Sequence, residues 1–174
     1  VGGGNTAIDA ARTALRLGAS HVTVAYRRTR DEMPAQPEEI EEAAEEGISF
    51  EFLVAPVEVV KNGGPRAVAL RLQRMRLGEF DDGGRRRPVA IDGEFVELPA
   101  SHIIRAIGQK PIVIKGGPPV SKRGTVAADK WSLATEVPGV FAGGDAVLGP
   151  ATVVEAIAQG RRAAEAIERF MHPG

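Results

Sequence analysis

The chain has 174 residues, of which 43% are hydrophobic and 26% are charged, a composition typical of an ordinary globular protein. Its formal net charge of −1 provides no overall basic field for a nucleic acid, and no apolar run approaches the roughly 18 residues that cross a bilayer. The chain contains no cysteine and its three histidines lie far apart in the sequence, so we expect no disulfide, no iron–sulfur ligand and no metal site.

The first third of the chain predicts two helices that alternate with two parallel strands. Residues 5–17 carry apolar side chains at helical spacing before Gly18, and residues 21–26 form an apolar run typical of a buried strand. A second helix is expected over residues 37–46, where a proline begins it, and a second strand over residues 48–54. A strand end, a turn, a helix and a strand together make up a mononucleotide-binding unit.

The middle of the chain predicts an antiparallel β-meander over about residues 56–98. Four short strand-like runs are separated by turn sequences rich in Asn, Asp and Gly, the last of which is Asp92-Gly93; the runs cover residues 57–61, 67–77, 88–91 and 95–98. Three consecutive arginines, residues 85–87, lie on one of these turns, where we expect them to be solvated.

The remaining elements lie in the last part of the chain. A strand is expected over residues 102–107, a hairpin over 120–127 with Gly124 at its turn, and a short buried strand over 140–142. A final helix is expected over residues 151–170, and the side chains predicted to face the core are those of Val154, Ile157, Ala158 and Ile167. The elements together predict an α/β fold, a Rossmann-like three-layer (β/β/α) domain with an antiparallel β-meander inserted between its helix-linked strands.

The first seven residues carry a glycine pattern of the form G-x-G-x-x-A, made up by Gly2, Gly3, Gly4, Asn5, Thr6 and Ala7. Gly2 permits a tight turn, Gly4 lets a pyrophosphate approach the backbone, and Ala7 lets the helix pack closely on the sheet. Free N–H groups and the positive end of the helix dipole would then face the phosphates. The alternative is a tight strand–helix turn that binds no ligand.

The end of the second strand indicates which dinucleotide is bound. A site for NAD places an acidic residue there, whereas this chain has Arg27 and Arg28. Guanidinium groups bind a 2′-phosphate through charge-assisted hydrogen bonds, so the sequence predicts NADP(H). The alternative is that both arginines are only solvated charges at a strand end.

A second candidate site follows residues 140–142. Asp145 comes after two glycines at the end of the expected strand, where a carboxylate can bond a polyol or ribose chain, and a helix begins shortly afterwards. The alternative is an Asp that caps a helix or a turn.

Three stretches of the chain together resemble the flavin-dependent pyridine nucleotide oxidoreductases, specifically the glutamate synthase small (β) subunit group. They are residues 1–9 with 26–28, residues 106–108 and residues 139–145 with the helix that follows. The resemblance implies that the first motif belongs to an NADP(H) domain inserted into an FAD domain. It implies that Gly108 lies at the crossing back to the FAD domain, Gly144 lies against the FAD pyrophosphate, and Asp145 bonds the ribityl chain. Thr152 and Val153 would be the helix start that faces the flavin ring.

The chain departs from this family because it lacks the glycine motif of the FAD domain. We therefore expect a fragment, with residues 1–107 forming an NAD(P)H-binding domain without most of its first strand and residues 108–174 forming the C-terminal part of an FAD-binding domain. Such a chain is expected to bind FAD poorly when it is isolated, and to be cytoplasmic.

The resemblance implies hydride transfer from NADPH to FAD and onward electron transfer to an iron–sulfur protein or large subunit. The cofactors supply this chemistry, so no catalytic residue is assigned. Two alternatives stay open at this point. One is a related electron-transfer subunit, of the ferredoxin–NADP reductase, sulfide dehydrogenase or dihydropyrimidine dehydrogenase kind. The other is a non-catalytic module that binds a nucleotide or a partner.

Overall fold

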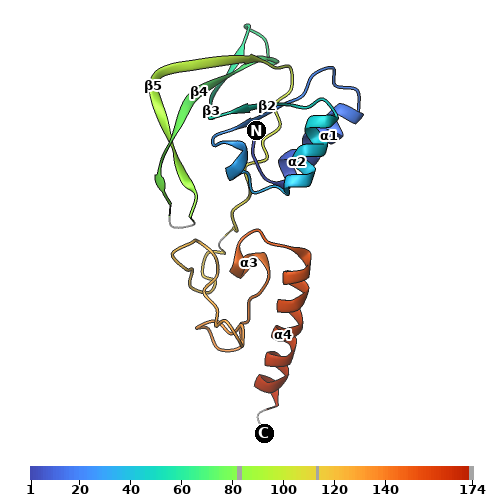
Figure 1. Ribbon diagram of the computed structural model, residues 1–174. Helices are drawn as coiled ribbons and strands as arrows, with labels where there is room; N and C mark the ends of the chain where they lie inside the picture. Colours follow the sequence, from blue (N-terminus) through green and yellow to red (C-terminus); the bar gives the residue numbers. More distant parts are fainter. Residues whose placement is uncertain (82–83, 113, 173–174) are drawn as a thin grey trace. The chain divides into compact units, whose positions relative to one another are not determined.

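The computed structural model describes residues 1–81, 84–112 and 114–172 (Figure 1). The chain divides into two compact units, Val1–Ile107 and Gly108–Gly174. Each unit has its own packing, and the two are described in turn.

The first unit begins with the predicted alternation of helices and strands. Its elements in chain order are α1 (Asn5–Arg16), β1 (Thr23–Tyr26), the 3₁₀ helix η1 (Arg30–Glu32), α2 (Pro37–Glu45) and β2 (Ser49–Phe52). β1 and β2 pair in parallel, with Thr23 opposite Ser49 and Tyr26 opposite Phe52. Both helices and both strands therefore form where the apolar pattern predicts them, and the strands are shorter by about two residues at their ends.

The two helices cover one face of the parallel strands. α1 buries Ala7, Ile8 and Ala11 because these residues recur on one side of the helix. Ile8 is fully buried and packs in one core with Val24 of β1 and Ile40 of α2. This core attaches the first helix firmly to the strand that follows it.

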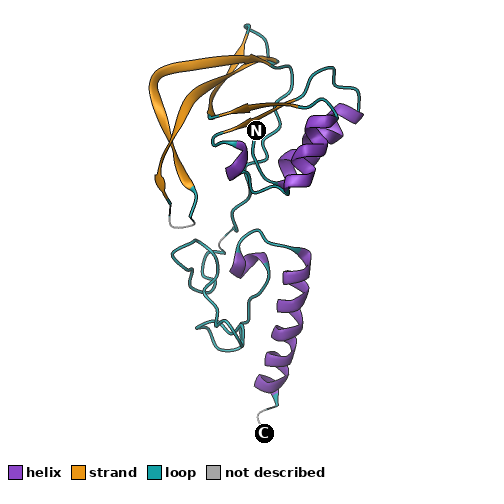
Figure 2. Cartoon of the chain, viewed as in Figure 1, coloured by secondary structure: helices purple, strands orange, loops and turns teal. Residues whose placement is uncertain are grey.

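The β-meander covers the other face of the parallel strands. Its strands are β3 (Val54–Lys61), β4 (Ala67–Phe80) and β5 (Arg86–Pro99), which form an antiparallel sheet in the order β3-β4-β5. Leu70 and Leu72 of β4 pack against Ala25 of β1 and Val54 of β3. Helices, parallel strands and meander thus form three layers (Figure 2), which confirms the predicted three-layer β/β/α fold class.

The prediction of four short strands in the meander is wrong, because the runs 88–91 and 95–98 belong to one continuous strand, β5. Asp92-Gly93 is not a hairpin turn but part of an irregular stretch of β5, where Gly93 has a positive φ of 77°. The side-chain amide of Gln73 in β4 donates to the carbonyl oxygens of Ile91 and Glu94, the latter at 2.8 Å. These bonds satisfy carbonyl groups that the interrupted ladder leaves unpaired, so the strand continues.

Residues 102–107 do not form the predicted strand. The Ala106 N–H donates to the Val1 carbonyl (2.8 Å), and the Val1 amino group donates to the Ile104 carbonyl (2.7 Å). These two bonds join the segment to Val1 without making it a strand.

The second unit contains few regular elements apart from α3 (Asp145–Leu148) and α4 (Val153–Met171). The hairpin predicted over 120–127 is present as a single antiparallel bridge between Val120 and Val126, with Gly124 at a positive φ of 79°. The buried strand predicted over 140–142 is wrong. Phe141 forms only one bridge, to Ala134, and Val140 is 37% exposed.

The predicted inner face of α4 is also wrong. Gln159 and Ala166 are the buried residues of this helix, whereas Val154 is 76% exposed and Ile157 is 56% exposed. Both faces of the helix carry small or apolar residues, so apolar spacing alone did not determine which face packs within the unit. The side-chain oxygen of Gln159 accepts from the N–H of Gly144 at 2.6 Å, so the buried polar group on this face has a partner inside the unit.

Candidate functional site

The glycine-rich turn is built into the parallel sheet of the first unit. The Gly2 N–H donates to the Ala25 carbonyl of β1 at 3.1 Å, while Val1 is bonded to residues 104–106 on its other side. Val1 and Gly2 therefore lie between β1 and the segment that leaves the unit. The chain then turns through Gly3 and Gly4 and enters α1.

Two of the three glycines are required by contacts inside the protein. A Cβ at Gly2 would lie 2.2 Å from the Ala106 carbonyl oxygen, and the φ of +143° is itself unfavourable for other residues. A Cβ at Gly3 would lie 2.4 Å from Cε2 of Tyr26. No side chain fits at either position without displacing a neighbour.

Gly4 differs from the other two glycines because the space beside it is open. The nearest atom to a Cβ there is Cγ of Pro34, at 3.8 Å, and the φ of −93° suits any residue. Gly4 is the N-cap of α1, where no side chain caps the helix and no acidic residue occupies the first turn. Backbone N–H groups at an uncapped helix start, with open space above them, form a surface suited to a phosphate.

The loop that follows β1 is bonded to the turn. The Asn5 side-chain oxygen accepts from the Gln36 N–H (2.9 Å), and the Gly3 carbonyl accepts from the Ala35 N–H (3.1 Å). Asn5 and Thr6 are exposed, whereas Ala7 is buried under the helix as predicted for close packing on the sheet. The turn is therefore held by hydrogen bonds to β1 and to the two residues that precede α2.

Tyr26 is a structural part of the site that the sequence analysis missed. Its ring fills the space beside Gly3, and its hydroxyl donates to the Glu32 carbonyl at 2.9 Å. A capping box between Thr29 and Glu32 fixes the same stretch of loop. The sequence held a signal for this contact. Gly3 occupies the first x of G-x-G-x-x-A, where the motif accepts any residue, and Tyr26 is an aromatic residue at the strand end.

The structure gives the two arginines after β1 different environments. Arg27 is exposed, and within the described residues its guanidinium has no hydrogen-bond or ion-pair partner. Arg28 is only 4% exposed, and its guanidinium donates to the Arg86 carbonyl (2.7 Å) and to the Asp81 carboxylate (3.0 Å). Arg27 is therefore available to an anion, while Arg28 is engaged with the meander. A phosphate contact by Arg28 stays a prediction.

The candidate flavin residues of the second unit are placed as follows. Gly108 is exposed with a φ of +87°, and Gly144 is buried as the N-cap of α3 with its N–H engaged by Gln159. Asp145 is exposed and accepts a hydrogen bond from the Ala151 N–H at 3.2 Å. This contact is the turn-forming role that we kept as the alternative for Asp145.

Thr152 and Val153 lie at the start of α4. Thr152 is the N-cap and forms a capping box with Glu155, whose pKa is lowered by the hydrogen bonds that it accepts from the hydroxyl and N–H of Thr152. Val153 is 75% exposed. The exposed Asp145, Thr152 and Val153 thus surround the start of one helix, and their contacts to a flavin stay predictions.

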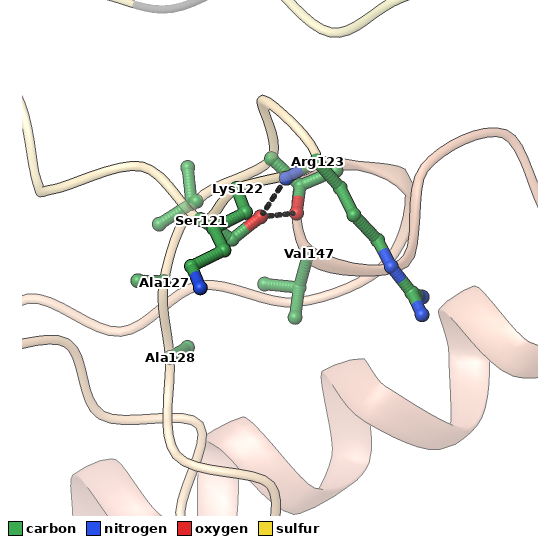
Figure 3. Close-up of a pocket in the computed structure, with 8 residues that line it drawn as sticks. Ser121, Lys122, Arg123, Ala127, Ala128 and Val147 are labelled. Carbon is green, nitrogen blue, oxygen red and sulfur yellow. Dashed lines mark hydrogen bonds between the residues drawn. The ribbon is translucent and has the colours of Figure 1, made fainter. Parts of the chain in front are cut away.

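An open pocket of about 420 Å³ lies in the second unit, between the 120–127 hairpin and Val147 (Figure 3). The Ser121 hydroxyl lies 2.9 Å from the Thr125 hydroxyl and accepts from the Arg123 N–H. None of the predicted site residues lines this pocket, and the two hydroxyl groups that line it lie within hydrogen-bond distance of each other. In the part of the chain that the structure describes, no three or more His, Cys, Asp or Glu residues gather as a metal site, and no helix is long and apolar enough to cross a membrane.

Comparison with protein families gives a match over most of the chain. The model described as pyridine nucleotide-disulphide oxidoreductase matches residues 1–160. The chain is 50% identical to the NADP(+)-dependent formate dehydrogenase subunit beta of Moorella thermoacetica, with 100% of the chain and 25% of that protein covered. It is 39% identical to the glutamate synthase [NADPH] small chain of Escherichia coli strain K12, with 98% of the chain and 38% of that protein covered.

A solved structure has a similar fold. The thioredoxin reductase of Lactococcus lactis superimposes with a TM-score of 0.77 at 24% identity, covering 97% of this chain and 50% of that one. The chain therefore spans between a quarter and a half of the length of these three proteins.

Proposed function

Because the chain belongs to the pyridine nucleotide-disulphide oxidoreductase family, we propose that its first unit, Val1–Ile107, binds NADP(H) for hydride transfer to FAD. The family membership agrees with the resemblance found in the sequence. When bound together, NADPH and FAD supply the hydride chemistry, and the protein supplies binding and orientation.

The open helix start beside Gly4 supports binding of the pyrophosphate. No side chain caps the first turn of α1, and a side chain at Gly4 would occupy the space that a phosphate needs. Gly2 and Gly3 hold the turn in place through their contacts with Ala106 and Tyr26.

The exposed guanidinium of Arg27 is the observation that carries the preference for NADP(H) over NAD(H). It lies one residue beyond β1, at the strand end where an NAD site requires an acid, and no described group neutralises it. The names of both sequence relatives contain NADP or NADPH, which supports the same choice. We assign the 2′-phosphate contact first to Arg27, with Arg28 behind it.

We propose that the second unit, Gly108–Gly174, is part of a flavin-binding domain, with Asp145, Thr152 and Val153 near the flavin. Gly144 fits less well as a pyrophosphate contact, since its N–H is already bonded to Gln159. The chain has no cysteine and so contains no redox dithiol, and electrons would leave the flavin for an acceptor outside these residues. The two relatives serve different enzymes, so we propose the shared NADPH-to-flavin step, as in glutamate synthase, without one final acceptor.

Calorimetric titration of the chain with NADP⁺ and NAD⁺ tests the first part of this proposal. We expect NADP⁺ to bind at least tenfold more tightly, which corresponds to about 1.4 kcal/mol. Equal affinities would contradict the assignment of the 2′-phosphate contact. NADPH-dependent dye reduction with added FAD then distinguishes an active flavoprotein from a module that only binds the nucleotide.

A further inference from the structure

The buried guanidinium of Arg28 connects the end of β1 to the far end of the β4–β5 hairpin. Its Nε donates to the Arg86 carbonyl at 2.7 Å, and its terminal nitrogen lies 3.0 Å from the Asp81 carboxylate. Asp81 follows β4 directly, and Arg86 is the first residue of β5. One side chain thus contacts the residue that follows β4 and the residue that begins β5, the two strands drawn as a long hairpin in Figure 1.

This connection brings a run of arginines to the strand end. Arg85 and Arg87 are the neighbours of Arg86, so their Cα atoms lie about 3.8 Å from that of Arg86. Arg27 is in the same way the neighbour of Arg28. Arg28 and Arg86 are 58 positions apart in the sequence, and the hydrogen bond between them places the backbone of residues 85–87 beside the Arg28 guanidinium.

The side chains of Arg85 and Arg87 are exposed, and in the described part of the chain neither forms a hydrogen bond or an ion pair. Arg86 uses its Nε to bond the Gly78 carbonyl within the hairpin at 3.2 Å. Arg85 and Arg87 therefore carry the free positive charge of this turn.

Three arginines near this turn have no partner for their charge. The guanidinium groups of Arg27, Arg85 and Arg87 are exposed and form no hydrogen bond or ion pair among the described residues. Asp81 is already engaged by Arg28. Unpaired like charges that lie close together repel one another, and a dianionic phosphate relieves this repulsion.

We infer that residues 85–87, where β5 begins, are part of the subsite for the adenosine 2′-phosphate, with Arg85 and Arg87 as further ligands and Arg28 as the positioning residue that holds this segment. This inference rests on the proposed binding of NADP(H) at the end of β1. Residues 85–87 of the meander then help to select NADP(H) over NAD(H), instead of forming only the solvated turn that the sequence predicts.

The test compares adenosine 2′,5′-bisphosphate with adenosine 5′-monophosphate, which differ only in the 2′-phosphate, by calorimetric or NMR titration of the full chain. In the variant R85A/R87A we expect the bisphosphate to bind about tenfold more weakly while the monophosphate is unchanged. The matched control is K61A/R66A, which removes two exposed cations from the opposite end of β4 and should leave both affinities as they are.

A second variant, D81N, tests the positioning role of Arg28. Removing a carboxylate near a phosphate strengthens phosphate binding if only the charge matters. If Arg28 holds the hairpin through Asp81, D81N weakens binding of the bisphosphate instead, and we expect a loss of about threefold to fivefold.

The outcomes separate the two proposals. A wild-type chain that binds both probes equally contradicts the proposed function itself, and this inference with it. A wild-type preference for the bisphosphate that survives in R85A/R87A overturns the hairpin assignment alone. Tighter bisphosphate binding by D81N overturns the positioning role of Arg28.

Discussion

The ring of Tyr26 occupies the place where a side chain at position 3 would lie, since a Cβ on Gly3 would be 2.4 Å from Cε2 of the ring. Strand end and glycine turn are thus fitted to each other directly. The fit makes the shape of the turn depend on an aromatic residue that would not contact the phosphate.

Replacing Gly3 with Ala should therefore destabilise the first unit. We expect a loss of about 1–3 kcal/mol in the free energy of unfolding, because the added methyl group displaces the buried Tyr26 ring. Urea denaturation followed by circular dichroism measures it. In a double-mutant cycle with Tyr26→Leu, the cost of Gly3→Ala should shrink, and simple additivity of the two changes would contradict the contact.

Gly4→Ala, in contrast, should weaken nucleotide binding and leave stability nearly unchanged. The nearest atom to its Cβ is 3.8 Å away, so we expect the free energy of unfolding to change by less than about 1 kcal/mol, the effect of losing a glycine N-cap. NADP⁺ should bind about tenfold more weakly, because the methyl group stands where the pyrophosphate approaches. Unchanged affinity in a folded variant would show that the phosphate lies elsewhere.

Replacing Arg27 with Ala should weaken nucleotide binding alone, whereas replacing Arg28 with Ala should weaken binding and also lower stability. Arg27→Ala should lower NADP⁺ affinity about tenfold and leave both NAD⁺ affinity and stability unchanged, because its guanidinium has no described partner. Arg28→Ala should also cost about 1–3 kcal/mol of stability, since the Arg86 carbonyl and the Asp81 carboxylate lose their donor. Calorimetry and urea denaturation on the same samples measure both effects. Full stability of Arg28→Ala would contradict its role in joining β1 to the hairpin.

The ion pairs that Arg12 and Arg16 of α1 form with Glu46, just after α2, should make stability fall in acid. The hydrogen bond from Arg12 is the largest cause that lowers the pKa of Glu46 below its ordinary value of 4.5, with Arg16 adding to it against partial desolvation. A carboxylate with a lowered folded pKa stabilises the protein above pH 4.5, and this contribution is lost as the pH falls through the lowered value.

Unfolding curves between pH 7 and pH 3 check this expectation. The wild-type chain should be more stable than Glu46→Gln at neutral pH, and the difference should disappear in acid. Glu45→Gln, which changes an exposed neighbour on α2, is the matched control and should show no such difference. A stability difference for Glu46→Gln that does not shrink as the pH falls below 4.5 would argue against the ion pair as its source.

The helices and the paired strands of the first unit were predictable because their signals are local. Pro37 begins α2, and Gly18 follows the end of α1. Apolar spacing also identified the buried Ile8 and Ala11. The G-x-G-x-x-A pattern located the turn because its residues are consecutive, and the structure explains Gly2 and Gly3 by contacts that a sequence does not display.

The features that the sequence did not reveal depend on distant partners. The continuity of β5 depends on the Gln73 side chain from another strand, and the burial of Arg28 depends on residues of the hairpin more than fifty positions away. The face of α4 that packs carries Gln159, which bonds Gly144, while apolar residues such as Val154 and Ile157 are exposed. A local sequence pattern cannot predict such contacts, because each forms between residues that only the fold brings together.

The contact between Gly2 and Ala106 has an evolutionary consequence. The Gly2 position is closed by the protein's own carbonyl group, so selection for a stable fold would keep that glycine in a descendant that had lost its nucleotide. Gly3 is held in the same way by Tyr26. A divergent homologue that keeps these two glycines therefore shows shared ancestry but not ligand binding. Replacement of Gly4 would indicate the loss of the ligand sooner than replacement of Gly2 or Gly3.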